Sequence, residues 1–285
     1  MEQRGLMAVH AHPDDEVIST GGVLAAAAER GLPTTVVTCT GGERGEIVGE
    51  GMDAEEIRPR LAEVRRAELS AALDLLGAGP PVLLGYVDSG MMGTDGNADP
   101  QAFWNAPFDE AVARLVTHIR AARPSVLVTY DAFGGYGHPD HIQAHRVALV
   151  ASEAAAVAAL YPDAGPAWRI PKVYLATIPK SAILAGSQAL TAAGLPSPFG
   201  APERLADVTM GCADADLGAV VDVRPWLDRK WAALRAHRSQ IGPESFFLNV
   251  PDTLRDEMFG TEWFIRYRSD VASNGVEHDL FAGLA

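Results

Sequence analysis

Short apolar runs that alternate with helical stretches constrain the fold of this chain more than any other feature. The runs are rich in β-branched residues, and their length is typical of buried strands. The strand–helix–strand order predicts an α/β fold, with a Rossmann-like, mostly parallel sheet between flanking helices. The expected strands are Leu6–Val9, Thr34–Cys39, Pro81–Tyr86, Ser125–Tyr130 and Lys172–Ala176.

Helices are expected between these strands. An alanine-rich helix ends near Arg30–Gly31. A long helix runs from a cap at Asp53 to about Leu76, and Pro59 restricts where its first turn begins. A third helix begins at Phe108, where apolar residues recur at helical spacing.

The domain organisation follows from where this alternation weakens. After about Tyr161 the pattern is broken by proline and glycine, although Ala219–Val223 is a further expected strand. The composition does not change enough to mark a second domain. We therefore expect residues 1–285 to form one domain, with an α/β core that holds the site in 1–170 and a smaller C-terminal extension in 171–285 that covers it.

The charge of the chain limits its partners. With 37 acidic and 23 basic residues the formal net charge is -14, so a nucleic-acid backbone or an anionic membrane surface would be repelled. No apolar run reaches the roughly 18 residues that span a bilayer, and residues 1–5 lack the apolar core of a secretion signal. The two cysteines, Cys39 and Cys212, indicate no disulfide framework. These features predict a soluble cytoplasmic protein that binds neither nucleic acid nor membrane.

The stretch after the first strand, Val9–Glu16, carries two histidines and three carboxylates. It lies at the carboxyl end of a strand, where open α/β sheets hold their ligands. From a tight loop His12 and Asp15 can turn toward one divalent ion, with Asp14 beside it to take a proton from water. Spacing alone would let the two aspartates exchange roles, and the stretch taken alone also fits an ordinary acidic first turn of a helix.

A second loop of the same kind follows a later strand. Asp131–His141 comes directly after Ser125–Tyr130 and precedes a helix. Bringing His141 beside His12 and Asp15 would give two histidines and one carboxylate with an open coordination position, which is typical of catalytic zinc, although ferrous iron accepts the same donors. A dinucleotide site is disfavoured, because no glycine-rich fingerprint follows the first strand.

The two loops resemble a known family. The pairing of Ala11–Glu16 with Gly137–His141 is similar to the zinc-dependent N-acetylglucosaminyl deacetylases of the LmbE/PIG-L family. Further stretches look like the mycothiol-pathway branch of that family, which contains a deacetylase acting on N-acetylglucosaminyl-inositol and a mycothiol S-conjugate amidase. These stretches are Thr38–Thr40, Gly45–Glu46, Asp88–Thr94, Thr129–Asp131 and Gly134–Gly137, and the similarity resumes at Leu234–His237 and Asp279–Leu284.

The resemblance implies a role for each matching residue. The metal ligands would be His12, Asp15 and His141, and the general base would be Asp14. It further implies that His138, oriented by Asp140, acts as an electrostatic partner or acid, and that Tyr136 helps to hold the oxyanion. Three more residues match positions that grip the inositol and sugar hydroxyls: Glu46, Arg65 and Asp88.

The implied reaction is hydrolysis of the N-acetyl group of N-acetylglucosaminyl-inositol, giving acetate and the free amine. Asp88–Thr94 looks like the deacetylase, and Ser19 stands where the amidase is expected to carry lysine. Thr40–Ile47 and Phe281–Gly283 look closer to the amidase. The deacetylase is the favoured prediction. The alternatives are the amidase, a deacetylase for another amino sugar such as an antibiotic precursor, and a non-enzymatic sugar-binding protein. Each would take a small amino sugar or pseudodisaccharide as partner.

Overall fold

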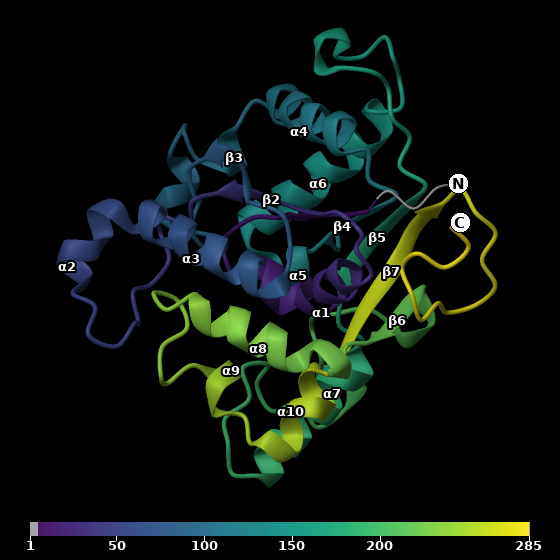
Figure 1. Cartoon of the computed structure of the whole chain (residues 1–285). Helices are drawn as coiled ribbons and strands as arrows, with labels where there is room; N and C mark the ends of the chain where they lie inside the picture. Colours follow the sequence, from purple (N-terminus) through teal and green to yellow (C-terminus); the bar gives the residue numbers. More distant parts are fainter. Residues whose placement is uncertain (1–4, 285) are drawn as a thin grey trace.

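The computed structural model describes residues 5–284 and contains a seven-stranded sheet in the order β3-β2-β1-β4-β5-β7-β6 (Figure 1). Strands β1 to β5 run parallel, whereas β7 lies antiparallel to both β5 and β6. This topology confirms the predicted α/β fold. The strands are β1 (Leu6–His10), β2 (Thr34–Thr40), β3 (Val82–Tyr86), β4 (Val126–Tyr130), β5 (Lys172–Thr177), β6 (Ala219–Asp222) and β7 (Thr261–Ser269).

Helices cover both faces of the sheet and extend beyond one end of it (Figure 1). In the described part of the chain, seven helices have eight or more residues: α1 (Asp15–Glu29), α3 (Leu61–Leu76), α4 (Phe108–Ala122), α6 (Pro139–Ala154), α7 (Lys180–Ala192), α8 (Leu227–Ala236) and α10 (Asp252–Phe259). Three more are single turns: α2 (Ala54–Ile57), α5 (Gly134–Gly137) and α9 (Phe246–Asn249).

Two hydrophobic clusters, one on each face of the sheet, form the core. Alternate residues of β1 point to opposite faces, because successive strand side chains alternate in direction. Leu6 and Ala8 lie in the cluster that α1, α3 and α8 cover, and Met7 and Val9 lie in the one that α4 and α6 cover. Burial of β1 on both faces explains its uninterrupted apolar sequence.

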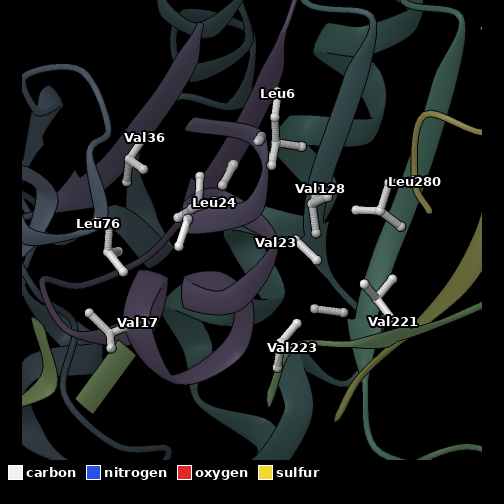
Figure 2. Packing of buried hydrophobic residues seen from close by; sticks show 14 of the residues in the cluster. Leu6, Val17, Val23, Leu24, Val36, Leu76, Val128, Val221, Val223 and Leu280 are labelled. Carbon is white, nitrogen blue, oxygen red and sulfur yellow. The ribbon is translucent and has the colours of Figure 1, made fainter. Parts of the chain in front are cut away.

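The first of these clusters joins distant parts of the chain. Figure 2 shows Val17 and Leu24 of α1 packed among strand residues and the C-terminal Leu280. Val221 and Val223 enter the same cluster from β6 and the residue that follows it. The C-terminal part of the chain is therefore part of the same core as β1.

The adjacency of β1 and β4 places the two motif loops side by side. β1 pairs with β2 on one side and with β4 on the other, as in the registers Leu6↔Thr34 and Leu6↔Val126. The strand order reverses at this point, and the crevice outside the carboxyl ends of such strands is the usual ligand site of open α/β sheets. The loops that follow His10 and Tyr130 therefore meet there.

The prediction of one long helix from Asp53 to Leu76 is wrong in its first part. Asp53 does act as a cap, because its Oδ1 accepts the amide of Glu55 at 2.9 Å, but α2 is only one turn long. A 3-10 turn with Pro59 in its middle follows, and α3 begins at Leu61. Proline lacks an amide hydrogen and crowds the preceding turn, which breaks the helix here.

Strand β7 was not expected from the sequence. It carries Glu262, Arg266 and Arg268 among its apolar residues, which obscures the strand pattern. Glu262 is nevertheless buried, because Lys230 pairs with it at 2.7 Å and the amides of Gly22 and Val23 also bond to it. Residues 171–285 thus contribute β5, β6 and β7 to the same sheet, and we propose that residues 1–285 form a single domain.

Among residues 5–284, no helix has both the length and the apolar character that crossing a bilayer requires.

Close packing of α1 against the segment after β6 generates a stability prediction. A Cβ added to Gly22 would lie 2.3 Å from the Cβ of Val223. We expect Gly22→Ala to lower the free energy of unfolding by about 1–3 kcal/mol, because overpacking forces neighbouring groups apart. Gly186→Ala on α7 is the control, since its Cβ would meet only the end of Met258 at 3.4 Å. Urea denaturation measures both, and equal stability of the two variants would contradict the packing described.

Candidate active site

Three donor atoms from the two motif loops converge on one point. His12 and Asp15 follow β1, and His141 lies in the first turn of α6 after β4. The His12 Nδ1 and Asp15 Oδ2 atoms are 3.4 Å apart, and the His141 Nε2 atom lies 3.4 Å from the same oxygen. The facing nitrogens of the two histidines are 3.2 Å apart. All three side chains are buried. We call these residues the three-donor cluster.

The outward-facing nitrogens of the two histidines are occupied as hydrogen-bond donors. His12 Nε2 donates to the Asp140 carboxylate at 3.2 Å, and His141 Nδ1 donates to the Gly134 carbonyl at 3.1 Å. Asp140 is itself held by the amide of Ser89 at 2.8 Å and by the Ser89 hydroxyl. With the hydrogens on the outer nitrogens, each ring in its neutral form presents the lone pair of its inner nitrogen toward the other ring and the Asp15 carboxylate.

This arrangement fits a divalent metal ion. Two lone pairs and a negative charge repel one another unless a cation lies between them. Tetrahedral zinc with N and O ligands requires roughly 3.3–3.6 Å between donor atoms, and the distances in the cluster nearly match this. The outer carboxylate and carbonyl are the partners that metal-binding histidines usually have.

The electrostatic environment distinguishes the two histidines. Burial lowers the pKa of His141 to about 4, so its ring is neutral, as a metal ligand must be. Burial also acts to lower the pKa of His12, but hydrogen bonds to Asp140, Asp15 and Asp88 outweigh it and raise that pKa well above its usual value. Negative charge is thus concentrated around His12, and a metal ion bound at its inner nitrogen would replace the proton that this raised pKa favours there.

Asp14 lies next to the cluster in an unusual backbone conformation. Its φ is 111°, and its side chain makes no capping bond to α1. The carboxylate instead pairs with Arg65 Nη2 at 3.2 Å, while Arg65 Nη1 donates to the Gly42 carbonyl at 2.9 Å. Burial raises the pKa of Asp14 to about 6, against the opposing effect of Arg65. A pKa close to the working pH suits a general base.

The backbone of Asp14 is held by a second pair. Its amide donates to Glu16 Oε2 at 2.9 Å, and Glu16 Oε1 accepts from His237 Nε2 at 2.7 Å. Glu16 and His237 are both fully buried. In the sequence analysis, His237 was noted only as part of Leu234–His237, a stretch that resembles the family, and no role was predicted for Glu16.

His138 and Asp140 are arranged differently from the expectation. The Asp140 carboxylate is hydrogen-bonded to His12. His138 is linked to Asp140 through the backbone, because its Nδ1 accepts the Asp140 amide at 3.1 Å as the cap of α6. Its Nε2 therefore carries the hydrogen when the ring is neutral, and burial lowers its pKa. Donor atoms of His12, His138 and His141 all lie within 4.8 Å of one another.

Tyr136 lies at the edge of the cluster. Its ring centroid is 4.9 Å from that of His141 and 6.3 Å from that of His138, in edge-on contacts. About half of the side chain is exposed. Burial raises the pKa of this tyrosine, so its hydroxyl remains a hydrogen-bond donor.

The three residues matched to sugar and inositol contacts lie in different places. Asp88 is buried beside His12, with its Oδ1 3.6 Å from the His12 Nε2 and accepting the Gly90 amide at 2.7 Å. Arg65 is buried and engaged by Asp14. Glu46 is exposed on the loop after β2.

Tyr130 is a site residue that the sequence reasoning missed. Its hydroxyl donates to Asp15 Oδ2 at 2.6 Å and accepts the Ala11 amide at 2.8 Å. Its ring also stacks on that of His141 with centroids 4.2 Å apart. Its signals in the sequence were its position as the last residue of a strand that leads into the second loop and its place in Thr129–Asp131, one of the stretches that resemble the family.

A cavity of about 650 Å³ opens from the cluster. Asp14, Asp15, Tyr136 and His141 line one end of it. The other walls come from the part of the chain that contains α7, α9 and α10, which gather on one side of the molecule (Figure 1). These walls are largely apolar and include Ile178, Ile183, Phe199, Met210, Phe246, Phe247, Met258 and Phe259.

Comparison with known proteins gives consistent results. The family described as PIG-L: GlcNAc-PI de-N-acetylase matches residues 7–152. The 1D-myo-inositol 2-acetamido-2-deoxy-alpha-D-glucopyranoside deacetylase of Geodermatophilus obscurus is 46% identical, covering 99% of this chain and 98% of the relative. A protein with the same name, numbered 1, from Catenulispora acidiphila is 44% identical, covering 99% and 90%. The structure of N,N'-diacetylchitobiose deacetylase from Pyrococcus horikoshii has a TM-score of 0.60 at 18% identity, covering 92% of this chain and 83% of that one, which supports the fold.

The geometry predicts separate roles for the ligands and for Asp14. We expect His141→Ala to lose most bound metal, because it removes one of the three donors. Asp14→Asn should retain about as much metal as the unsubstituted protein, because the Asp14 carboxylate is paired with Arg65. Elemental analysis after saturation with Zn²⁺ and desalting measures the metal that each variant retains. Equal metal loss in both variants would show that the assignment is wrong.

Proposed function

The chain belongs to the PIG-L family of GlcNAc-PI de-N-acetylases, and we propose that it hydrolyses the N-acetyl group of 1D-myo-inositol 2-acetamido-2-deoxy-alpha-D-glucopyranoside in mycothiol biosynthesis. The products are acetate and the free amine. The observation that carries the proposal is the position of Asp14 beside the three-donor cluster, at the head of a cavity large enough for a pseudodisaccharide. Identity above 40% to deacetylases of this name over nearly the whole chain supports it.

We propose Zn²⁺ as the ion held by His12, Asp15 and His141. When bound there it would polarise the acetyl carbonyl and lower the pKa of water. Ferrous iron accepts the same donors and is the alternative occupant.

The remaining chemistry is assigned to side chains of this protein. Asp14, ionised near neutral pH, takes the proton of the attacking water. Tyr136 and the Nε2 hydrogen of His138 donate hydrogen bonds to the oxyanion that develops on the acetyl carbonyl. As the carbon–nitrogen bond breaks, Asp14 returns to the departing amine the proton that it took from water. His138 is the alternative donor only as an imidazolium, a form in which its Nδ1 would no longer accept the Asp140 amide.

Three further side chains are proposed to recognise the substrate. Glu46, Arg65 and Asp88 would contact the sugar and inositol hydroxyls. The structure supports a second role for Arg65, since its guanidinium pairs with Asp14 and is almost completely buried. Substituting Arg65 should therefore affect kcat as well as KM.

The base assignment predicts a large loss of turnover. We expect Asp14→Asn to lower kcat for acetate release by about 100- to 10,000-fold, because a positioned base contributes that much to hydrolysis. The assay uses metal-loaded protein and the inositol glycoside named above. Asp163→Asn, an exposed aspartate far along the chain, is the matched control and should keep full activity. Comparable rates for the two variants would refute the role of Asp14.

The apolar cavity walls favour a second candidate function. A sugar–inositol substrate carries hydroxyl groups over most of its surface, and its acetyl methyl and ring C–H groups would match only a small part of these walls. A mycothiol S-conjugate carries an apolar group on sulfur that could lie against Phe199, Phe246 and Phe259. The same metal and base would cleave its amide, so the second candidate is a mycothiol S-conjugate amidase.

Substrate competition separates the candidates. We expect a higher kcat/KM for N-acetylglucosaminyl-inositol than for N-acetylglucosamine or for a mycothiol conjugate with an S-linked aromatic group. Phe199→Ser, which makes the cavity wall polar, should reduce cleavage of the conjugate more than acetate release. Faster cleavage of the conjugate by the unsubstituted protein would favour the amidase, and preference for N-acetylglucosamine would indicate another amino-sugar deacetylase. Binding of all three without hydrolysis by metal-loaded protein would indicate a sugar-binding protein.

A further inference from the structure

The Glu16–His237 pair is a buried polar contact that the proposed chemistry does not use. The two side chains have no exposed surface and lie 221 residues apart in the sequence. Glu16 Oε1 accepts from His237 Nε2 at 2.7 Å. Among the described residues this is the only hydrogen bond of the His237 side chain, because its Nδ1 has no partner. The His237 imidazole therefore serves as a hydrogen-bond partner of Glu16.

Glu16 connects this pair to the backbone of Asp14. Its second oxygen, Oε2, accepts the Asp14 amide at 2.9 Å. Asp14 precedes α1 and has a φ of 111°, a region that residues with side chains rarely adopt and that surrounding contacts must stabilise. The Glu16 carboxylate supplies such a contact from within the first turn of the helix.

The unusual conformation determines where the Asp14 carboxylate points. An aspartate at this position ordinarily caps its helix, with its side chain accepting amides of the first turn. Asp14 makes no such bond, and its carboxylate instead faces Arg65 and the cavity. If the Asp14 amide were released, the residue could relax to an ordinary cap and carry its carboxylate away from the reacting atoms.

The segment around His237 is anchored to the helix that also holds the Asp14 carboxylate. Ser239 donates through its amide and its hydroxyl to Glu68 of α3, at 2.8 and 2.7 Å. Arg65, one turn earlier in α3, pairs with Asp14 at 3.2 Å. Helix α3 thus orients the Asp14 side chain directly, through Arg65. It also orients the Asp14 backbone indirectly, because Glu68 anchors the segment that contains His237.

We propose that Glu16 and His237 are positioning residues that keep the Asp14 carboxylate available as the base by preventing it from capping α1. The inference rests on the proposed function, in which Asp14 takes a proton from water. Neither residue contacts the substrate in this scheme. Their loss should lower kcat and leave the metal ligands and KM nearly unchanged.

The test compares two substitutions of His237. His237→Phe keeps the ring but removes the donor to Glu16, and we expect it to lower kcat for acetate release by about 10- to 100-fold, as small misplacements of reacting groups do. KM should change by less than about threefold, since substrate contacts remain. His237→Gln retains a donor in a similar position and should recover most of the activity. His278→Gln, an exposed histidine outside the cavity lining, is the matched control.

A double-mutant cycle separates positioning from a general effect on structure. In the Asp14→Ala background, His237→Phe should cause no further loss of kcat, because it acts only through Asp14. An equal loss in both backgrounds would overturn the inference. Metal content and thermal unfolding are measured for every variant.

A second variant keeps the proposal testable if His237→Phe does not fold. Glu16→Gln has nearly the same volume, but its side chain has one acceptor oxygen for the two donors that Glu16 serves, so it should also lower kcat. A folded, metal-loaded Glu16→Gln with unchanged kcat would overturn the inference. If the unsubstituted protein releases no acetate from the inositol glycoside, the proposed function fails and the inference fails with it. If the unsubstituted protein releases acetate and both variants have the same kcat as His278→Gln, the proposed function stands and only the inference fails.

Discussion

Convergence of two imidazole lone pairs and one carboxylate on a single point is the constraint on which the rest of the site depends. Such a group attracts a cation, because its donor atoms repel one another at short range. The protein secures it from outside: Asp140 and the Gly134 carbonyl take the outer hydrogens of His12 and His141. Tyr130 fixes the Asp15 oxygen. The sheet contributes by pairing β1 with β4, which brings together loops 129 residues apart.

A second constraint is the placement of three consecutive acidic residues at the start of α1. They lie in one short segment but face different partners. Asp15 faces the histidines, Asp14 faces Arg65 and the cavity, and Glu16 faces His237. The positive φ of Asp14 makes this divergence possible. Burial of like charges so close together is tolerated because each has its own cationic or hydrogen-bonding partner.

The C-terminal part of the chain supplies strands of the sheet and most of the cavity walls. It completes the sheet with β6 and β7 and forms most of the cavity walls through α7, α9 and α10. The three-donor cluster comes from the parallel half of the sheet, and the shape of the cavity comes from these later elements. Relatives with the same three-donor cluster could therefore differ in substrate through changes confined to the cavity walls.

The sequence by itself determined the parallel half of the fold and the membership of the cluster. Apolar runs mark β1 to β5, and His12, Asp15 and His141 stand at strand ends within short motifs, so local pattern and family resemblance were sufficient. The break of the expected helix at Pro59 and the strand β7, whose Glu262 is buried against Lys230, were not predicted. Nor were the contacts of Asp140 with His12, of Arg65 with Asp14 and of His237 with Glu16. Only the tertiary structure decided these, because each joins side chains from different elements, and no local periodicity records which buried charge will meet which partner.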